Sequence, residues 1–139
     1  MPYWQLYYHI IWATKGRQPL LTGEVEETVH RMLWTKAIGL GARVYAVNGM
    51  PDHIHMLVSI PPSVSISEFV GKVKATASTR FNKADNDVCL YWQRGYGVFS
   101  FDRKSLQSHV HYVGGKGITM RKVAPFQLSS VRVMAMACS

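Results

Sequence analysis

The order of strand-like and helix-like segments is the feature that most restricts what this chain can fold into. Four runs of β-branched and aromatic residues are joined by stretches whose apolar residues recur at helical spacing or by turns. The resulting order, β-α-β-β-α-β, is the split βαβ pattern of an α+β, ferredoxin-like fold, in which helices cover one face of an antiparallel sheet. The strands are predicted at 3–14, 43–48, 53–60 and 98–101.

The two helices between these strands have recognisable ends. Thr22 is a candidate N-cap followed by glutamates that suit a helix N-terminus, and Gly39 or Gly41 supplies the C-terminal cap. Ser65 or Ser67 is expected to open the second helix. A polar loop is predicted to follow the second helix over 82–87.

The C-terminal part of the chain is predicted to be less regular than the rest. A third helix is expected to begin at Asp102 or Ser105 and to weaken at Gly114. Residues 117–139 show no clear period and are interpreted as an irregular C-terminal tail. A chain of 139 residues that is 47% hydrophobic suits one folded domain rather than a disordered polymer, and we place that domain at 1–116.

The net charge of +8 favours a polyanionic partner. A basic domain rich in aromatic residues is typical of nucleic-acid binding, and the alternative is a charge that only keeps the protein in solution. No apolar run is long enough to cross a bilayer, and no glycine motif indicates a nucleotide cofactor. Because the first residues also lack the pattern of a secretory signal, we expect a cytoplasmic location and no membrane partner.

Basic and aromatic residues at turns and on predicted helices are the candidate nucleic-acid contacts. Lysine and arginine side chains bind phosphates, and an exposed indole stacks on unpaired bases. For each basic residue the alternative is a solvated surface charge, and for Trp92 it is packing in the core. The candidate contacts are Lys15, Arg17, Lys72, Lys74, Arg80, Trp92, Arg94 and Arg103.

A pair of histidines carries the most specific chemical signal in the chain. His53 and His55 are two residues apart on a predicted strand, so both imidazoles are expected on the same face. Two neighbouring imidazoles bind a divalent ion when a third ligand joins them, and the alternative is two polar histidines on an exposed sheet face. Asp52 is interpreted as a turn residue in preference to a partner that orients His53.

A tyrosine on the third predicted helix is a candidate nucleophile. On a helix, His109, Tyr112 and Lys116 would share one face. A tyrosine hydroxyl is a poor nucleophile at its usual pKa near 10, but a metal ion and basic neighbours make it competent. The alternative is an amphipathic tyrosine that anchors the helix on the sheet.

These segments, taken in order, resemble a known family. The sequence His53-Ile54-His55 has the pattern of an HUH motif, in which U is an apolar residue. Residues 8–15 upstream read YHIIWATK, residues 92–100 downstream read WQRGYGVFS, and a predicted helix with a tyrosine follows. Over about 3–113 the chain looks like the single-tyrosine HUH transposases of small insertion sequences and their relatives that act on repetitive palindromic hairpins.

The resemblance implies a specific activity. Members of this family bind single-stranded DNA hairpins at element ends, require Mg²⁺ or Mn²⁺, and cleave and rejoin strands through a 5′-phosphotyrosine intermediate. They are typically homodimers in which the tyrosine helix of one subunit completes the site of the other. By resemblance, His53 and His55 are metal ligands and Tyr112 is the nucleophile. His9 and Trp12 belong to the family pattern and are interpreted as structural.

One position departs from the family pattern. The family has a glutamine four residues after the tyrosine as a further metal ligand, whereas this chain has Lys116, whose ammonium cannot ligate a metal. Three readings follow: His109 supplies the third ligand, Lys116 contacts phosphate directly, or the chain is a catalytically degenerate protein that still binds hairpin DNA.

Overall fold

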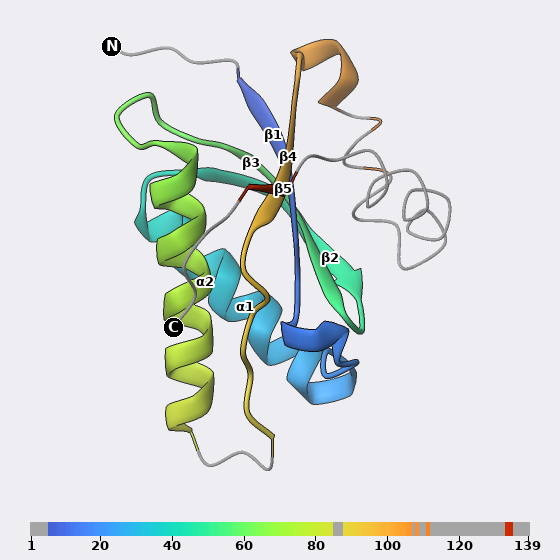
Figure 1. Cartoon of the computed structure of the whole chain (residues 1–139). Coiled ribbons are helices and arrows are strands. Elements are labelled where there is room, and N and C mark those ends of the chain that lie inside the picture. The colour runs from blue at the N-terminus through green and yellow to red at the C-terminus, as the bar shows by residue number, and fades with distance from the viewer. Residues whose placement is uncertain (1–5, 85–87, 107, 109–110, 112–132, 135–139) are drawn as a thin grey trace.

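One antiparallel sheet organises the molecule, with its strands in the order β2-β3-β1-β4-β5 (Figure 1). The computed structural model describes residues 6–84, 88–106, 108, 111 and 133–134. The order of the first four strands is the one expected for the ferredoxin-like α+β fold, which is therefore confirmed. The strands are β1 (Tyr7–Ala13), β2 (Arg43–Met50), β3 (His53–Ser59), β4 (Tyr96–Phe101) and β5 (Val133–Met134).

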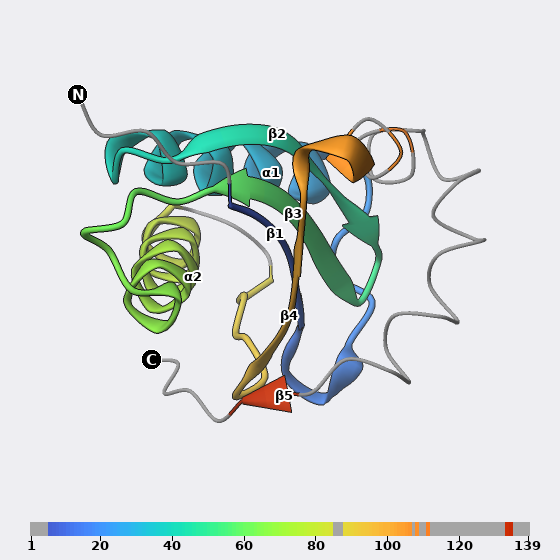
Figure 2. The same cartoon turned by 90° about the horizontal axis from the view of Figure 1, so that it is seen from above.

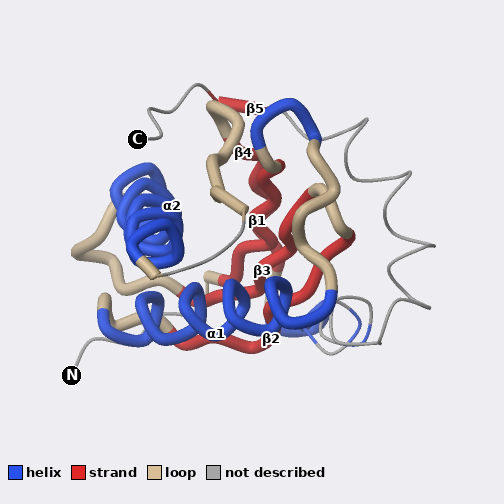
Figure 3. The backbone as a smooth tube through the Cα atoms, turned by 90° about the horizontal axis from the view of Figure 1, so that it is seen from below, coloured by secondary structure: helices blue, strands red, loops and turns tan. Residues whose placement is uncertain are grey.

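Two helices cover one face of this sheet, as Figures 2 and 3 show from opposite sides. They are α1 (Gly23–Gly39) and α2 (Ile66–Lys83). The main core lies between them and the sheet, where buried residues of α1 and α2 pack against Ile10, Ile54 and Met56. Because side chains alternate along a strand, the neighbours of these residues point to the opposite face. That opposite face carries both histidines of the HUH motif.

The ends of α1 and α2 agree with most of the sequence analysis. Ser65 caps α2, because its Oγ accepts a hydrogen bond from the Glu68 N–H at 3.1 Å. Thr22 occupies the N-cap position of α1 but makes no hydrogen bond with its side chain. The expected loop over 82–87 begins later than predicted, since α2 continues through Asn82. The Asn82 side chain accepts from the Leu90 N–H and donates to the Leu90 carbonyl, at 2.6 and 2.8 Å, and so joins the last turn of α2 to the segment that follows the loop.

The hairpin between β2 and β3 is tighter than predicted. The strand predicted at 43–48 is longer in the structure, where β2 continues to Met50 and only Pro51 and Asp52 form the turn. This close pairing requires glycine at position 49, because a Cβ on Gly49 would collide with the carbonyl oxygen of His53. Near the other end of β2 the register with β3 shifts between Val44 and Ala46.

The C-terminal part contains a strand that the sequence analysis missed. β5 pairs with β4 and lies within 117–139, where we expected only an irregular tail. A short 3-10 helix, η2 (Arg103–Ser105), follows β4, and the Asp102 carboxylate accepts from the Ser105 N–H at 3.1 Å. The predicted third helix continues into positions outside the described residues, Tyr112 among them. Among the described helices, none has the length and apolar character that crossing a membrane requires.

Candidate functional site

The histidines of the HUH motif lie side by side at the N-terminal end of β3. His53 pairs with Ala13 of β1 and Met50 of β2, while His55 pairs with Ile11 and Asn48. The two imidazole rings are 4.9 Å apart between centroids, on the face opposite α1 and α2. The shared face expected from the two-residue spacing is therefore present. Both side chains are buried, with exposed fractions of 3% for His53 and 0% for His55.

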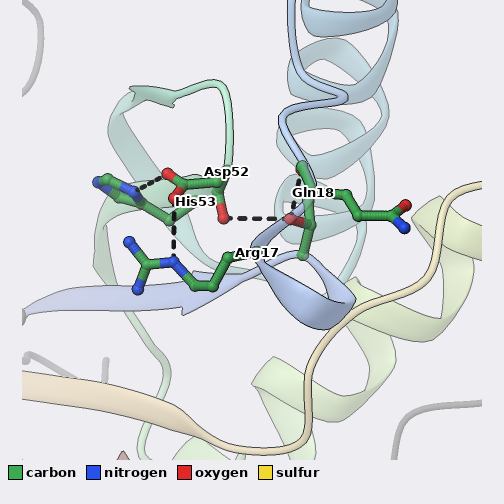
Figure 4. A network of polar contacts seen from close by, with 5 residues as sticks. Arg17, Gln18, Asp52 and His53 are labelled. Atoms are coloured by element: carbon green, nitrogen blue, oxygen red, sulfur yellow. Dashed lines mark hydrogen bonds and ion pairs between the residues drawn. The ribbon is translucent and has the colours of Figure 1, made fainter.

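Asp52 orients the first of these imidazoles. His53 Nδ1 lies 2.7 Å from Asp52 Oδ1, and the other carboxylate oxygen accepts from Arg17 Nε at 2.9 Å (Figure 4). Asp52 does lie in a turn, as interpreted from the sequence, but its carboxylate also fixes the ring of His53. The interpretation that favoured a turn role alone was incomplete. A carboxylate that accepts from one imidazole nitrogen leaves the other nitrogen with its lone pair available.

A third histidine, which we interpreted as structural, orients the second imidazole. His9 Nε2 on β1 lies 2.8 Å from His55 Nδ1, and the two ring centroids are 5.0 Å apart. His9 pairs with Leu57 in the register of β1 and β3, so it is diagonal to His55 on the same face. Sequence alone could not identify this contact because it depends on that register.

The Nε2 atoms of His53 and His55 are the chemically available groups of the site. Both are buried and have no hydrogen-bond partner among the described residues. An unsatisfied buried polar atom costs about 1–3 kcal/mol, so a pair of them on one face indicates a missing ligand. Their Nδ1 atoms are already engaged, which is the arrangement typical of metal-ligating histidines. The donor set fits a divalent ion that accepts two imidazole nitrogens.

Both imidazoles are held in the neutral form that a metal requires. Burial lowers the pKa of His55 to about 2, and the nearby His9 and His53 act in the same direction. Burial also lowers the pKa of His53, against the opposing hydrogen bond and charge of Asp52. Although burial acts to raise it, the pKa of Asp52 is lowered by its hydrogen bonds from His53 and Arg17. Two neutral imidazoles beside a carboxylate can ligate a cation.

The ligand set is not complete within the part of the chain that the structure describes. No group of three or more His, Cys, Asp or Glu side chains suited to a metal occurs there. His109, Lys116 and the candidate nucleophile Tyr112 lie outside the described residues. Further ligands would come from those positions, from a substrate or from water.

The remaining basic candidates lie at two places on the surface. Lys15 and Arg17 are exposed on η1 (Lys15–Arg17), directly after β1, and Arg94 is exposed in the segment before β4. Lys72 and Arg80 are exposed on α2, where Lys72 Nζ is 2.8 Å from a Glu68 carboxylate oxygen. The side chain of Arg103 is outside the described residues.

Two candidate DNA contacts are corrected by the structure. Lys74 is only 1% exposed, and its ammonium donates to the carbonyl oxygens of Gln93 and Gly95 at 3.0 and 2.9 Å. Trp92 is 3% exposed, stacks edge-on against Trp12, and donates its indole N–H to the Lys74 carbonyl at 2.9 Å. Both side chains are core residues. Helical periodicity did not distinguish the buried lysine from its exposed neighbours because the carbonyl oxygens that accept from its ammonium belong to a segment distant in the sequence.

The split βαβ sheet and the two adjoining imidazoles on the face opposite α1 and α2 are consistent with the transposase family that the sequence resembles. The comparison with protein families agrees. The model of IS200-like transposases matches residues 2–116, and the chain therefore belongs to the IS200-like transposase family.

Two curated relatives are named as transposases. The chain is 38% identical over 77 residues to the ISDra2 transposase TnpA of Deinococcus radiodurans, a match that covers 55% of each protein. It is 33% identical over 101 residues to the transposase for insertion sequence element IS200 of Salmonella typhimurium, covering 68% of this chain and 66% of the relative. The chain thus spans between about half and two thirds of the length of these relatives.

Solved structures share the fold. A crystal structure of a protein of Deinococcus radiodurans that is assigned as a transposase superposes with a TM-score of 0.64 at 26% identity, covering 83% of this chain and 93% of that one. A REP-associated tyrosine transposase bound to a REP hairpin superposes with a TM-score of 0.61 at 15% identity, covering 86% and 72%. At that identity the second likeness shows the fold alone.

Proposed function

We propose that this protein cleaves and rejoins single-stranded DNA at hairpin-bearing element ends, with Tyr112 as the nucleophile and a divalent ion held by His53 and His55. The observation that carries the proposal is the pair of buried Nε2 atoms without partners, each on a ring whose Nδ1 is already engaged. Each Nε2 offers its lone pair to a cation when the Nδ1 of the same ring carries the proton, and both rings lie on one face of the sheet.

In the proposed reaction the Tyr112 hydroxyl oxygen attacks the scissile phosphorus. A bond forms between phosphorus and the tyrosine oxygen, the bond to the 3′ oxygen breaks, and the tyrosine proton balances the alkoxide so that a 3′-OH is released. The product is a 5′-phosphotyrosine link, which conserves the energy of the broken ester. A second 3′-OH then attacks this link, so rejoining needs no nucleotide cofactor.

His53 and His55 would hold Mg²⁺ or Mn²⁺, and the ion would neutralise phosphate charge and orient the scissile group. Mg²⁺ and Mn²⁺ both accept oxygen ligands readily, so the substrate phosphate and water would supply further ligands beside the two imidazoles. Asp52 and His9 act on the ligands rather than on the substrate, because each fixes one ring through its Nδ1. The protein itself contributes two imidazole nitrogen ligands that are rigid, neutral and shielded from water.

The proposed substrate is a DNA hairpin with adjoining single strand. The net charge of +8 and the exposed basic residues near η1 support a polyanionic partner. A structural neighbour was solved with a REP hairpin bound, which supports a hairpin as the partner of this chain as well. A homodimer, in which the tyrosine helix completes either its own site or that of the partner, is part of the proposal.

The proposal is tested by covalent capture on a denaturing gel. The protein is incubated with Mn²⁺ and a labelled pool of single-stranded hairpins taken from the DNA that flanks its gene. We expect a shifted, protease-sensitive band that EDTA abolishes, that Tyr112→Phe lacks, and that His55→Ala lacks although it remains folded. An adduct that persists in Tyr112→Phe assigns the nucleophile to another residue, and one that persists in His55→Ala contradicts the metal site.

The second candidate function is a hairpin-binding protein without strand-transfer activity. Lys116 favours it, because a lysine at the family glutamine position removes one expected metal ligand. This candidate predicts retained hairpin binding and no adduct under any metal condition. Lys116→Gln separates the two readings, since restoring the amide should produce or strengthen the adduct if the lysine is the defect.

A further inference from the structure

An exposed tyrosine lies on the segment before β4 that runs beside the end of β1. Thr14 and Trp92 form an isolated antiparallel bridge. On either side of it the Lys15 N–H donates to the Tyr91 carbonyl and the Gln93 N–H donates to the Ala13 carbonyl, both at 2.9 Å. The backbone of this segment is therefore an additional short extended stretch beside the C-terminal end of β1, the strand that pairs with β3.

Side-chain alternation decides which aromatic of this stretch faces outward. Trp92 points into the core at 3% exposed, so its neighbour Tyr91 points away from the core and is 48% exposed. Ala13 pairs with His53 across β1 and β3. The register therefore places Tyr91 on the side of the sheet that carries the histidine pair. Trp92 was a candidate stacking residue with core packing as the alternative; in the structure Trp92 lies in the core and its neighbour Tyr91 is exposed.

The surroundings of Tyr91 are basic. Lys15, whose backbone it binds, is exposed, and Arg17 follows on η1 with its side chain 45% exposed beside Asp52. Arg94, three residues after Tyr91, is also exposed. An aromatic ring flanked by cations is the combination that binds single-stranded nucleic acid, because the bases stack and the phosphates are neutralised.

The buried Lys74 fixes the segment before β4 through hydrogen bonds from the core side. Lys74 Nζ donates hydrogen bonds to the carbonyl oxygens of Gln93 and Gly95, which flank Arg94. The indole N–H of Trp92 donates to the Lys74 carbonyl oxygen. A ring presented on a segment tied to α2 and to β1 loses little conformational freedom when a base stacks on it. Such preorganisation distinguishes Tyr91 from a freely mobile surface tyrosine.

We infer that Tyr91, with Lys15, forms a stacking subsite for an unpaired base of single-stranded DNA next to the histidine pair. This inference rests on the proposed function and adds to it a particular recognition residue. Because stacking accepts any base, the subsite would hold the single strand that leaves the hairpin stem without reading its sequence.

The test compares two labelled hairpins by fluorescence anisotropy: one with a single-stranded oligo-dT extension and one with the stem and loop only. We expect Tyr91→Ala to weaken binding of the extended hairpin by about 5- to 150-fold, the range of one lost base stack. Binding of the stem alone should change by less than about twofold. Tyr91→Phe retains the ring and should bind like the wild type, and an iodouracil in the extension should crosslink to position 91.

The matched control is Trp34→Ala, which removes another exposed aromatic (39% exposed) from α1 on the helical face. It should leave both affinities unchanged. Equal losses for both hairpins in Tyr91→Ala, or no loss at all, overturn the subsite while wild-type binding keeps the proposed function intact. A wild-type protein that binds neither hairpin overturns the proposed function, and the subsite with it.

Discussion

His9 Nε2 lies 2.8 Å from His55 Nδ1, so a residue on β1 sets the protonation pattern of the histidine on β3. Only one of the two facing nitrogens can carry the shared proton. If His55 donates, its Nε2 keeps a lone pair; if His9 donates, the neutral His55 must carry its proton on Nε2 and cannot ligate an ion. Metal binding therefore needs His9 as the acceptor.

Replacement of His9 should consequently weaken the metal site without touching a metal ligand. We expect His9→Leu to lower Mn²⁺ affinity by about 10- to 100-fold, the usual effect of losing a group that orients a ligand. His9→Gln offers a carbonyl oxygen in place of Nε2 and should recover part of that loss. Isothermal titration of the purified variants with Mn²⁺ measures both. Wild-type affinity in His9→Leu would show that His55 is oriented by something else.

A side chain at position 49, in the hairpin between β2 and β3, should destabilise the protein. Gly49→Ala places a Cβ against the His53 carbonyl, so β2 and β3 must separate where the first histidine sits. We expect a loss of about 1–3 kcal/mol in unfolding free energy by urea denaturation, together with weaker Mn²⁺ binding. The matched control is Gly39→Ala, which meets nothing within 4 Å and should be neutral or slightly stabilising. Equal stability of the two variants would contradict the close approach.

The buried lysine should contribute more to stability than its exposed neighbour. Lys74→Met leaves the Gln93 and Gly95 carbonyls without their donor, and we expect a loss of about 2–4 kcal/mol in unfolding free energy. Lys72→Met removes an exposed pair with Glu68 and should cost less than about 1 kcal/mol. Urea titrations of both variants give the comparison. A Lys74→Met protein as stable as the wild type would show that the carbonyls find other donors.

Stability should fall in mild acid, partly because of a histidine far from the site. Burial lowers the pKa of His30 on α1 to about 4, while the unfolded chain keeps a value near 6.5. Between these values the unfolded state binds more protons, so unfolding free energy rises with pH from about 4 to 6.5 and falls on acidification. His30→Met should flatten this slope by about 1–3 kcal/mol over that window in urea titrations at several pH values. An unchanged slope would assign the effect to other buried histidines.

Features that depend on residues close together in the sequence were predicted, and features that depend on contacts between distant residues were not. The two-residue spacing of His53 and His55 determines a shared face because alternation along a strand is a local property. The Ser65 cap is likewise local, and it was predicted. The ends of β2 and α2 were not predicted. At these ends Gly49 contacts His53 across a turn and Asn82 contacts Leu90 across a loop.

Long-range contacts account for the errors in the candidate site. The partnership of His9 with His55 joins residues 46 positions apart and depends on strand register. Lys74 has the sequence environment of an exposed lysine, and only the fold brings carbonyls from 19 and 21 residues away to its ammonium. Trp92 and Tyr91 are neighbours whose side chains point to opposite sides, and the pairing of Trp92 with Thr14 decides which of them is buried.

The shift of register between Val44 and Ala46 has a consequence for how the protein behaves in solution. β2 is the outermost strand on its side of the described sheet, and an exposed strand edge invites other chains to add to it. The irregularity at Tyr45 interrupts the regular ladder of hydrogen-bonding groups along that edge, and the exposed Arg43 places a charge at its beginning. The strand next to the histidine pair is thereby made a poor template for the addition of a strand from another chain.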